Sequence, residues 1–361
     1  MAATAAAQSS GAAVFSSQHP MARPAFHVAP HELFRRPTVA PLETMKAPAP
    51  AGEPLRLSDL EKVGFLGEGA SGVVSKARHR RTGAVFALKM ARYPGTDVAE
   101  EVEALRRAAA GPSPHVVRCH AVLRGADDDE DEEPAYVLEL MDAGTLGDVL
   151  RRRGTRGVPE PALAEVASRC LDGLAHIHSR GVAHLDMKPD NLLANARGDV
   201  KIADFSVSRL LYGRSGERLR VSIAVGSLLH LSPERLQPNA HAGPRGAMAA
   251  DVWGLGVTLL ELFLGRCPIL RPGERASYEK VREAICDGEP PSVPESTAAS
   301  AALRGFVAAC LQKDPRRRAT VAQLRAHPFV AGRDVEESRR ALRELIMEGL
   351  CRSRRVAPSP N

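Results

Sequence analysis

The stretch HLDMKPDN, residues 184–191, places two carboxylates, a lysine, a histidine and an amide within eight positions. Asn191 is followed by LLANARGDVKIADFS, which is typical of a short strand, a turn at 197–199 and a returning strand. Because a hairpin brings its two ends together, we expect Asn191 and Asp204 to lie close to each other. An amide oxygen and a carboxylate in one place suit Mg²⁺, which takes its other ligands from phosphates and water.

Two residues just before this hairpin have complementary chemistry. Asp186 can accept the proton of a hydroxyl group, and Lys188 can neutralise a phosphate group during its transfer. Together with the predicted metal site, they indicate phosphoryl transfer from a metal-bound nucleotide to an alcohol.

A glycine-rich stretch, GEGASGVV, lies upstream at 67–74. A dinucleotide-binding fold has a similar glycine pattern, but it needs a helix that begins at the third glycine. Here the chain continues as VVSKARHRRTGAVFALKM, which predicts a strand, a turn and a second strand. The glycines are therefore expected in a loop between strands, where backbone N–H groups can approach phosphates.

In the stretch VFALKM, the period of two residues places Val85, Ala87 and Lys89 on one face of the predicted strand. Burying a lysine is costly without a counter-charge, so we expect phosphate oxygens and one carboxylate beside Lys89. Glu101 in the following helical stretch is the candidate carboxylate, and Glu103 is the alternative on a different helical face. A surface lysine on a half-exposed strand is the competing interpretation.

In this order the motifs resemble the eukaryotic protein kinase domain over residues 60–330, and the likeness continues through SPE, DVWGLG and DPRRRAT. The resemblance implies an α+β fold with a small β-rich N-lobe and a large helical C-lobe, and it implies ATP and Mg²⁺ as cofactors. The implied catalytic residues are Asp186, Lys188, Lys89 and Glu101, and the implied metal ligands are Asn191 and Asp204. Glu234 is expected to pair with Arg318, and Asp251 is expected to brace the catalytic loop.

Three further stretches, VLELMDAGTL, VGSLLHLSPERL and AHPFV, are similar to the mitogen-activated protein (MAP) kinase kinases, and to the plant members in particular. That likeness implies phosphorylation of Thr and Tyr in the activation loop of a MAP kinase, with a MAP kinase kinase kinase as the upstream activator. Lys188 and Ser227 fit hydroxyl amino acid substrates, and Leu138 is the implied gatekeeper. The backbones of Glu139 and Met141 would hold adenine. The implied nucleotide contacts are Gly67, Glu68, Gly69, Ala70, Ser71, Gly72, Val74, Ala87, Lys89, Leu138, Glu139 and Met141.

Two departures from this family concern control by phosphorylation. Most members carry arginine where this chain has Leu185, and that arginine receives an activation-segment phosphate through hydrogen bonds of about 1.5–3 kcal/mol. Plant members have Ser/Thr, five residues and Ser/Thr in the segment, whereas those places here hold Glu217 and Ile223, with Ser215 and Ser222 nearby. We therefore hypothesise that the phosphate-bearing residues and the arginine that receives the phosphate were lost together. Activity would then not be controlled by phosphorylation of the activation segment in the usual way.

A third departure is Ser206 in place of the glycine of Asp-Phe-Gly. Glycine adopts a positive φ freely, whereas serine is expected to lose about 1 kcal/mol in doing so. Since the residues for nucleotide, metal and proton transfer are all present, an active enzyme is favoured. The alternatives are a nucleotide-binding pseudokinase scaffold in a MAP kinase cascade and a Ser/Thr kinase outside the cascade.

The chain divides by composition into three parts. Residues 1–57, rich in Ala, Pro and Ser, predict a disordered extension rather than an organellar transit segment. The kinase-like region covers 58–330, with an N-lobe at 58–141 and a C-lobe at 142–330. A helix and tail follow at 331–361, and their apolar residues at helical spacing predict packing on the large lobe or binding of a partner.

Within the extension, FRRPTVAPL is a poor match to the basic and aliphatic docking motif of the family. Its candidate docking residues are Arg35, Arg36, Val39 and Leu42. A charged linker is the alternative.

The composition of the chain argues against a disulfide-bonded protein, a nucleic-acid-binding protein and a membrane-spanning protein. Six cysteines lie far apart without a C-x-x-C pair, which predicts free thiols in a reducing compartment, the cytoplasm or the nucleus. The net charge of +6 comes partly from arginine runs at 151–153 and 316–318 that are typical of solvated faces, so no nucleic-acid partner is expected. No apolar run reaches the roughly 18 residues that a membrane span needs.

Overall fold

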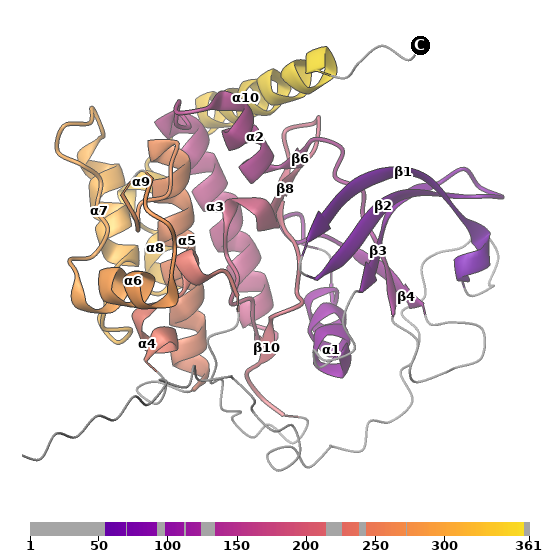
Figure 1. Ribbon diagram of the computed structural model, residues 1–361, viewed down its shortest axis with the longest axis horizontal. Coiled ribbons are helices and arrows are strands. Elements are labelled where there is room, and N and C mark those ends of the chain that lie inside the picture. Colours follow the sequence, from indigo (N-terminus) through magenta and orange to yellow (C-terminus); the bar gives the residue numbers. More distant parts are fainter. Residues whose placement is uncertain are drawn as a thin grey trace, which may run out of the picture. The chain divides into compact units, whose positions relative to one another are not determined.

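The computed structural model describes residues 55–356, apart from Ala70, Pro112, Pro272 and the segments 92–97, 124–133, 214–225 and 238–242. It describes the side chains of the last helix as far as Cys351. A β-rich N-lobe is followed by a helical C-lobe, which confirms the predicted α+β kinase fold (Figure 1). Nearly all of the extension predicted at 1–57, with its docking candidates, lies outside the described residues.

The N-lobe is one antiparallel sheet with the strand order β1-β2-β3-β5-β4, accompanied by helix α1 (Figure 1). Its elements are β1 (Leu60–Gly69), β2 (Gly72–His79), β3 (Val85–Ala91), α1 (Val98–Ala108), β4 (Cys119–Leu123) and β5 (Ala135–Leu138). Gly69 and Gly72 are opposite each other where β1 turns into β2. Gly72 has φ 145°, and a Cβ atom there would lie 2.1 Å from the Met90 carbonyl oxygen, so only glycine lets β2 approach β3 at this point.

Two long helices form the centre of the C-lobe, α3 (Glu160–His178) and α5 (Pro244–Leu264) (Figure 1). As its all-apolar pattern predicts, α5 is buried on every side, with Trp253 and Leu259 fully enclosed. Among the described residues, α5 is the one helix long and apolar enough to cross a membrane. Since 72% of its most apolar window is buried inside the fold, the same property is explained by its place in the core.

Shorter elements complete the C-lobe. Strands β6 (Gly144–Thr145), β8 (Leu192–Ala194) and β9 (Val200–Ile202) form one small sheet, and β7 (Val182–Ala183) pairs with β10 (Arg209–Leu210). The other helices are α2 (Leu146–Arg153), α4 (Pro233–Leu236), α6 (Tyr278–Arg282), α7 (Ala301–Cys310), α8 (Val321–Arg325) and α9 (Pro328–Ala331).

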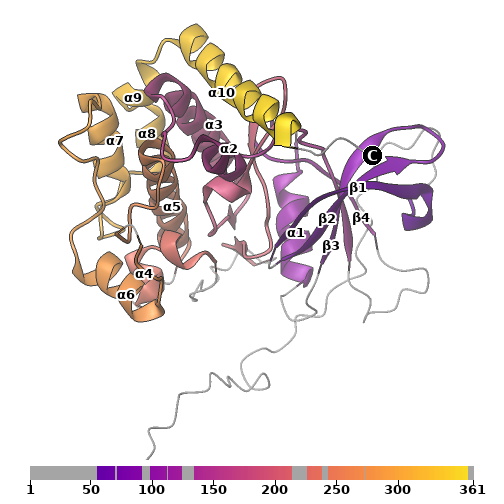
Figure 2. The same cartoon turned by 45° about the horizontal axis from the view of Figure 1, so that its top comes forward.

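The C-terminal helix α10 (Val335–Val356) lies along α3 and α2 (Figure 2). Leu342, Leu345 and Ile346 are buried on this side. Arg339 of α10 lies 3.6 Å from Glu165 of α3, which adds an ion pair to the apolar contact. The helix therefore packs on the large lobe, the first of the two arrangements expected for it.

Candidate active site

Lys89 on β3 is the junction of three elements. Its Nζ lies 3.3 Å from Glu101 Oε1 on α1 and 2.8 Å from Asp204 Oδ1, just after β9. Lys89 is 6% exposed and Glu101 is 5% exposed. Burial lowers the pKa of Lys89, but the two carboxylates outweigh burial and raise it above its ordinary value of 10.5. Lys89 is therefore a buried cation that joins α1, the sheet and the C-lobe.

Glu101, rather than Glu103, is the carboxylate that faces the lysine. The Tyr136 hydroxyl donates a hydrogen bond of 3.0 Å to Glu101 Oε2, which fixes the second oxygen of this carboxylate. Glu103 accepts hydrogen bonds from Arg106 and Arg107 instead. These bonds, that from Arg106 above all, lower the pKa of Glu103 to about 2. The two acids therefore occupy separate networks, as their different helical faces require.

Asp204 connects the C-lobe to the glycine-rich turn as well as to Lys89. Its Oδ2 accepts a hydrogen bond of 3.0 Å from the hydroxyl of Ser71, which lies between β1 and β2. Burial raises the pKa of Asp204, but the charge of Lys89 and the hydrogen bonds lower it well below its ordinary value of 3.8. The carboxylate is thus ionised at neutral pH.

In the Asp-Phe-Ser motif, residues 204–206, the residue with a left-handed backbone is Asp204 and not Ser206. Asp204 has φ 64°, whereas Ser206 is not among the non-glycine residues with positive φ in the described part of the chain. The expected strain of about 1 kcal/mol at Ser206 was therefore a wrong prediction, because the backbone turns two residues earlier. The Ser206 N–H donates to Asp204 Oδ1 at 3.4 Å, so the serine lies within the same motif.

Asp186 is surrounded by hydrogen-bond donors. Lys188 Nζ and Asn191 Nδ2 donate to its Oδ2 at 2.7 and 2.8 Å, and the Ser227 N–H donates to its Oδ1 at 2.7 Å. Lys188 also donates to Ser227 Oγ at 2.7 Å. Burial raises the pKa of Asp186, but the charge of Lys188 and these bonds lower it below its ordinary value. The carboxylate is therefore ionised, and Ser227 joins the activation segment to the catalytic loop.

Asp251 on α5 holds the backbone of the same loop. Its Oδ2 accepts from the His184 N–H at 2.9 Å, and its Oδ1 accepts from the Leu185 N–H at 2.6 Å. The His178 ring nitrogen Nε2 lies 2.7 Å from Oδ2. Burial raises the pKa of Asp251, and the contacts with His178 lower it below the ordinary value. The loop that carries Asp186 is thus fastened to the central helix of the C-lobe.

Glu234 and Arg318 form a two-pronged ion pair of 2.6 and 2.9 Å. Arg318 also donates to the Ala249 carbonyl at 2.8 Å, and its guanidinium carbon lies 5.2 Å from the centre of the Trp253 ring. The pair therefore connects α4, which follows the activation segment, to the core around α5.

The β8–β9 hairpin brings the two predicted metal ligands to its open end. Leu192 pairs with Ile202, and the Ala203 N–H donates to the Asn191 carbonyl at 2.9 Å. Asn191 directly precedes the first of these residues, and Asp204 directly follows the last. The expected approach of the two residues thus has its basis in strand pairing.

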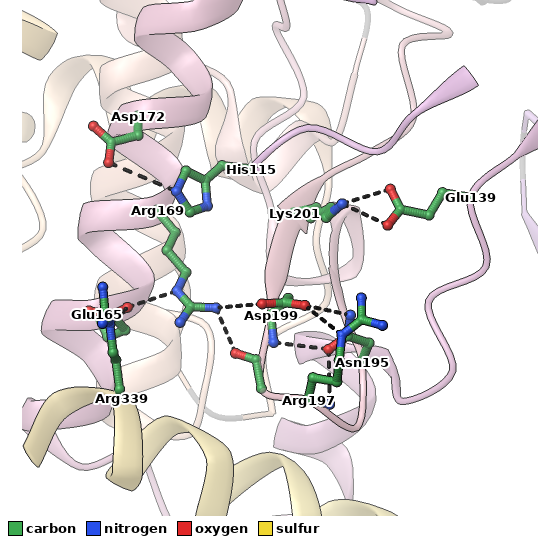
Figure 3. Close-up of polar contacts among 11 residues, drawn as sticks. His115, Glu139, Glu165, Arg169, Asp172, Asn195, Arg197, Asp199, Lys201 and Arg339 are labelled. Carbon is green, nitrogen blue, oxygen red and sulfur yellow. Dashed lines mark hydrogen bonds and ion pairs between the residues drawn. The ribbon is translucent and has the colours of Figure 1, made fainter. Parts of the chain in front are cut away.

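The closed end of the hairpin is fixed from α3. Asn195 Oδ1 accepts from the N–H groups of Arg197 and Asp199, and Arg169 of α3 donates to the Gly198 carbonyl at 2.6 Å (Figure 3). Arg169 in turn bonds to Glu165 at 2.9 Å. The hairpin that presents Asn191 and Asp204 is therefore braced at both ends.

Glu139 and Met141, which are predicted to hold adenine, lie in the connection between the lobes, after the predicted gatekeeper Leu138 at the end of β5. Leu138 and Met141 belong to a small apolar cluster with Val117, Leu193 and Ala203. The Glu139 N–H donates to the Arg118 carbonyl at 2.8 Å, and both oxygens of its carboxylate bond to Lys201 Nζ at 2.7 Å (Figure 3). The Glu139 side chain therefore ties this connection to β9.

The glycine-rich turn has room above it. Ideal Cβ atoms on Gly67 and Gly69 would meet nothing within 4 Å, and the Glu68 side chain is exposed. Val74 follows on β2 opposite Lys89, and Ala87 is buried on β3. The backbone is therefore open beside Gly67 and Gly69.

Leu185 is buried in a second apolar cluster. It is 4% exposed and packs with Ala183, Leu211, Ala247 and Ala250. Its φ is 65°, so its backbone is left-handed. An arginine at this position would have to bury its charge among these side chains or leave the cluster.

Some predicted residues have no described position. Ala70, Ser215, Glu217 and Ser222 lie outside the described residues, as do Arg35, Arg36, Val39 and Leu42.

Sequence reasoning also missed two residues of the site, Tyr136 and Arg235. Only the pairing of β3 with β5, which sets Tyr136 opposite Lys89, could have indicated the first, and a basic residue directly after Ser-Pro-Glu was the available signal for the second.

The donor set suits a divalent metal ion. Asn191 uses its Nδ2 on Asp186, which turns its oxygen Oδ1 to the other side, and Asp204 is ionised. These are the hard oxygen ligands that Mg²⁺ prefers. Over the described part of the chain, no group of three or more His, Cys, Asp or Glu could hold a metal ion. A metal here would therefore take further ligands from a nucleotide and water.

A buried lysine between two carboxylates, an ionised acid beside a lysine, and a hairpin that presents an amide and a carboxylate are together typical of the site of a protein kinase. The protein kinase domain family matches residues 60–330. That family uses ATP and a divalent metal ion.

Comparison with individual proteins narrows the family. Over 277 residues the chain is 40% identical to mitogen-activated protein kinase kinase 9 of Arabidopsis thaliana, an alignment that covers 75% of this chain and 84% of the relative. It is 38% identical to mitogen-activated protein kinase kinase 10 of the same plant over 79% of this chain and 88% of the relative. It is 39% identical to mitogen-activated protein kinase kinase 7 of the same plant, over 76% of this chain and 85% of the relative. The chain therefore belongs to the plant mitogen-activated protein kinase kinases.

Proposed function

We propose that this kinase transfers a phosphoryl group from Mg-ATP to Thr and Tyr in the activation loop of a MAP kinase, and that its own activation segment needs no phosphate for this. The observation that carries the proposal is the position of Lys89 between Glu101 and Asp204, at 3.3 and 2.8 Å. The relatives' names support a MAP kinase as the substrate, and we propose a MAP kinase kinase kinase as an upstream partner.

In this proposal each described residue has a defined task. Lys89 binds phosphate oxygens of ATP, and Glu101 keeps the lysine in place. Asp186 accepts the hydroxyl proton of the target residue, and Lys188 stabilises the charge on the transferring group. Asn191 and Asp204 would hold Mg²⁺, which neutralises charge on the phosphates.

Two features support activity without the usual gate. Leu185 occupies an apolar cluster, so it offers no charge to a phosphate. Helix α1 is instead attached to the start of the activation segment by hydrogen bonds between its charged side chains and backbone groups of that segment. Glu100 accepts from the Leu210 N–H at 2.9 Å, and Arg107 donates to the Tyr212 carbonyl at 3.1 Å. These bonds hold α1, and with it Glu101, where Lys89 requires them.

The test uses bacterially produced full-length protein, Mg-ATP and a panel of plant MAP kinases made inactive at their own active sites. Phosphate on both Thr and Tyr of a MAP kinase activation loop is expected with wild type and not with Asp204→Ala. Phosphate only on generic proteins such as casein would indicate a kinase outside the cascade. No transfer to any protein, with nucleotide binding intact, would indicate a scaffold.

A second arm of the experiment tests whether activity depends on phosphorylation of the activation segment. The rate is compared before and after treatment with an active MAP kinase kinase kinase. We expect a change of less than about threefold, since Leu185 offers no charge to a phosphate. A rise of a hundredfold with phosphate at Ser215 or Ser222 would overturn this part of the proposal.

A further inference from the structure

Arg235, in the short helix α4, reaches back to the catalytic loop. Its Nη1 donates a hydrogen bond of 2.5 Å to the carbonyl oxygen of Leu185, the residue directly before Asp186. The side chain is partly buried, and burial lowers its pKa to about 10 against the opposing pull of Asp251 and Asp186. It therefore remains a cation at neutral pH, close to both of these acids.

The carbonyl that Arg235 binds belongs to a strained residue. Leu185 has φ 65°, a left-handed conformation that strains a leucine and that its surroundings must therefore stabilise. Two bonds do so from opposite sides, since Asp251 accepts from the Leu185 N–H at 2.6 Å and Arg235 donates to its carbonyl. The residue before Asp186 is thus held on both sides, its N–H by a buried acid and its carbonyl by a cation.

The same guanidinium lies near Gly226, which directly precedes Ser227 in the activation segment. Gly226 has φ 115°, and a Cβ atom there would lie 3.1 Å from the Leu185 carbonyl oxygen and 3.7 Å from Arg235 Nη1. The next residue, Ser227, donates through its N–H to Asp186 Oδ1 at 2.7 Å. Arg235, the Leu185 carbonyl and Gly226 therefore lie close together, next to the Asp186 carboxylate.

We propose that Arg235 is a positioning residue that holds the catalytic loop and the Ser227 end of the activation segment together without a phosphate. In a kinase gated by phosphorylation, a phosphate pairs with an arginine before the catalytic Asp and fixes these two segments. Here the cation comes from the activation-segment side and its acceptor is a backbone carbonyl, which needs no modification. That Arg235 takes the place of a phosphate rests on the proposed function, in which the kinase is active without phosphorylation. The contact between Arg235 and Leu185 does not depend on that proposal.

A matched control is available in Arg304 of α7. It too donates to backbone carbonyls, those of Val293 at 2.8 Å and Pro294 at 3.0 Å, but it lies outside the catalytic loop. Arg235→Met and Arg304→Met each remove one such guanidinium. Arg235→Lys and Arg304→Lys keep the charge but lose the planar fork.

Two readouts are measured on the full-length protein. For Arg235→Met we expect kcat for MAP kinase phosphorylation to fall about tenfold or more, with KM for ATP changed less than about twofold, because a misplaced acceptor slows the chemical step. Arg304→Met should keep kcat within about twofold, and Arg235→Lys should fall between Arg235→Met and wild type. Equal loss of kcat in the two Met variants, unchanged kcat in Arg235→Met, or a Lys variant no better than Met would each overturn the proposal. If Arg235→Met does not fold, the two Lys variants are compared by the same criteria.

Hydrogen–deuterium exchange without any substrate separates this inference from the proposed function. In Arg235→Met, the amides of Leu185 and Ser227 should exchange about tenfold faster or more, while those of α3 stay unchanged. This result can be obtained even if wild type transfers no phosphate, in which case the proposed function fails and the positioning role stands. Unchanged exchange at Leu185 and Ser227 overturns the positioning role whatever the activity is.

Discussion

The hydroxyl of Ser71, in the glycine-rich turn of the N-lobe, donates a hydrogen bond to Asp204 of the C-lobe across 3.0 Å. Asp204 binds Lys89 through its other oxygen, so one carboxylate links the turn above it with β3 beside it. The two lobes are thus joined through the residue to which we assign the metal.

Replacing Ser71 with alanine removes the bond that holds the turn over Asp204. We expect KM for ATP to rise about fivefold, which corresponds to a hydrogen bond of about 1 kcal/mol to a charged, partly exposed acceptor. The measurement is steady-state kinetics with varied ATP. Ser75→Ala, on the neighbouring strand β2, is the control, and an unchanged KM in Ser71→Ala would contradict the prediction.

Replacing Tyr136 with phenylalanine keeps the ring beside Lys89 but removes the hydroxyl that binds Glu101. We expect kcat/KM to fall about fivefold, because Glu101 loses one of the contacts that aim it at Lys89. Tyr278→Phe serves as the control, since its hydroxyl contacts the Leu236 carbonyl away from the site. A loss in the control as large as in Tyr136→Phe would mean that the effect is not specific.

Replacing Leu185 with arginine, the residue common in the family, should destabilise this protein. The new charge would enter the cluster of Ala183, Leu211, Ala247 and Ala250, and we expect a loss of about 3 kcal/mol in the free energy of unfolding. Urea denaturation of Leu185→Arg and of the apolar control Leu185→Met measures the difference. Wild-type stability in the arginine variant would show that the cluster opens easily toward solvent.

Glu165 provides a pH-dependent contribution to stability. This buried acid accepts from Arg169 at 2.9 Å and lies 3.0 Å from Arg333, which precedes α10. Burial raises the pKa of Glu165, but the arginines lower it below its ordinary value of 4.5. In the unfolded chain Glu165 has its ordinary pKa of 4.5, and in the folded protein its pKa is lower. The ionised Glu165 therefore contributes its full stabilisation above about pH 4.5, and this stabilisation is lost as the pH falls through the pKa of the folded protein.

We therefore expect Glu165→Gln to be less stable than wild type by about 3 kcal/mol at pH 7, with the gap shrinking below pH 4.5. The urea midpoint at several pH values measures it. Glu336→Gln, whose side chain is 91% exposed on α10, is the matched control and should change little. A gap that is constant from pH 7 to pH 3 would exclude the charge as its cause.

Much of the fold and the site follows from local sequence. The glycine pattern, the strand around Lys89 and the turn between Asn191 and Asp204 depend on neighbouring residues, so their periodicity was readable directly. The lysine's partner was predictable as one of two acids, but the choice of Glu101 over Glu103 required the orientation of α1. Tyr136 could not be recognised, because nothing in its own segment distinguishes it from any other strand tyrosine.

The chain's sequence alone determined that this is a kinase fold whose residues suit acid, base and metal-binding roles, because those motifs are short and each is built by adjacent residues. Only the tertiary structure decided where the backbone is strained, at Leu185 and Asp204 and not at Ser206. It also decided that Arg235, fifty positions away along the chain, binds Leu185. Such contacts arise when separate elements pack together, and the spacing of residues along the sequence carries no record of them.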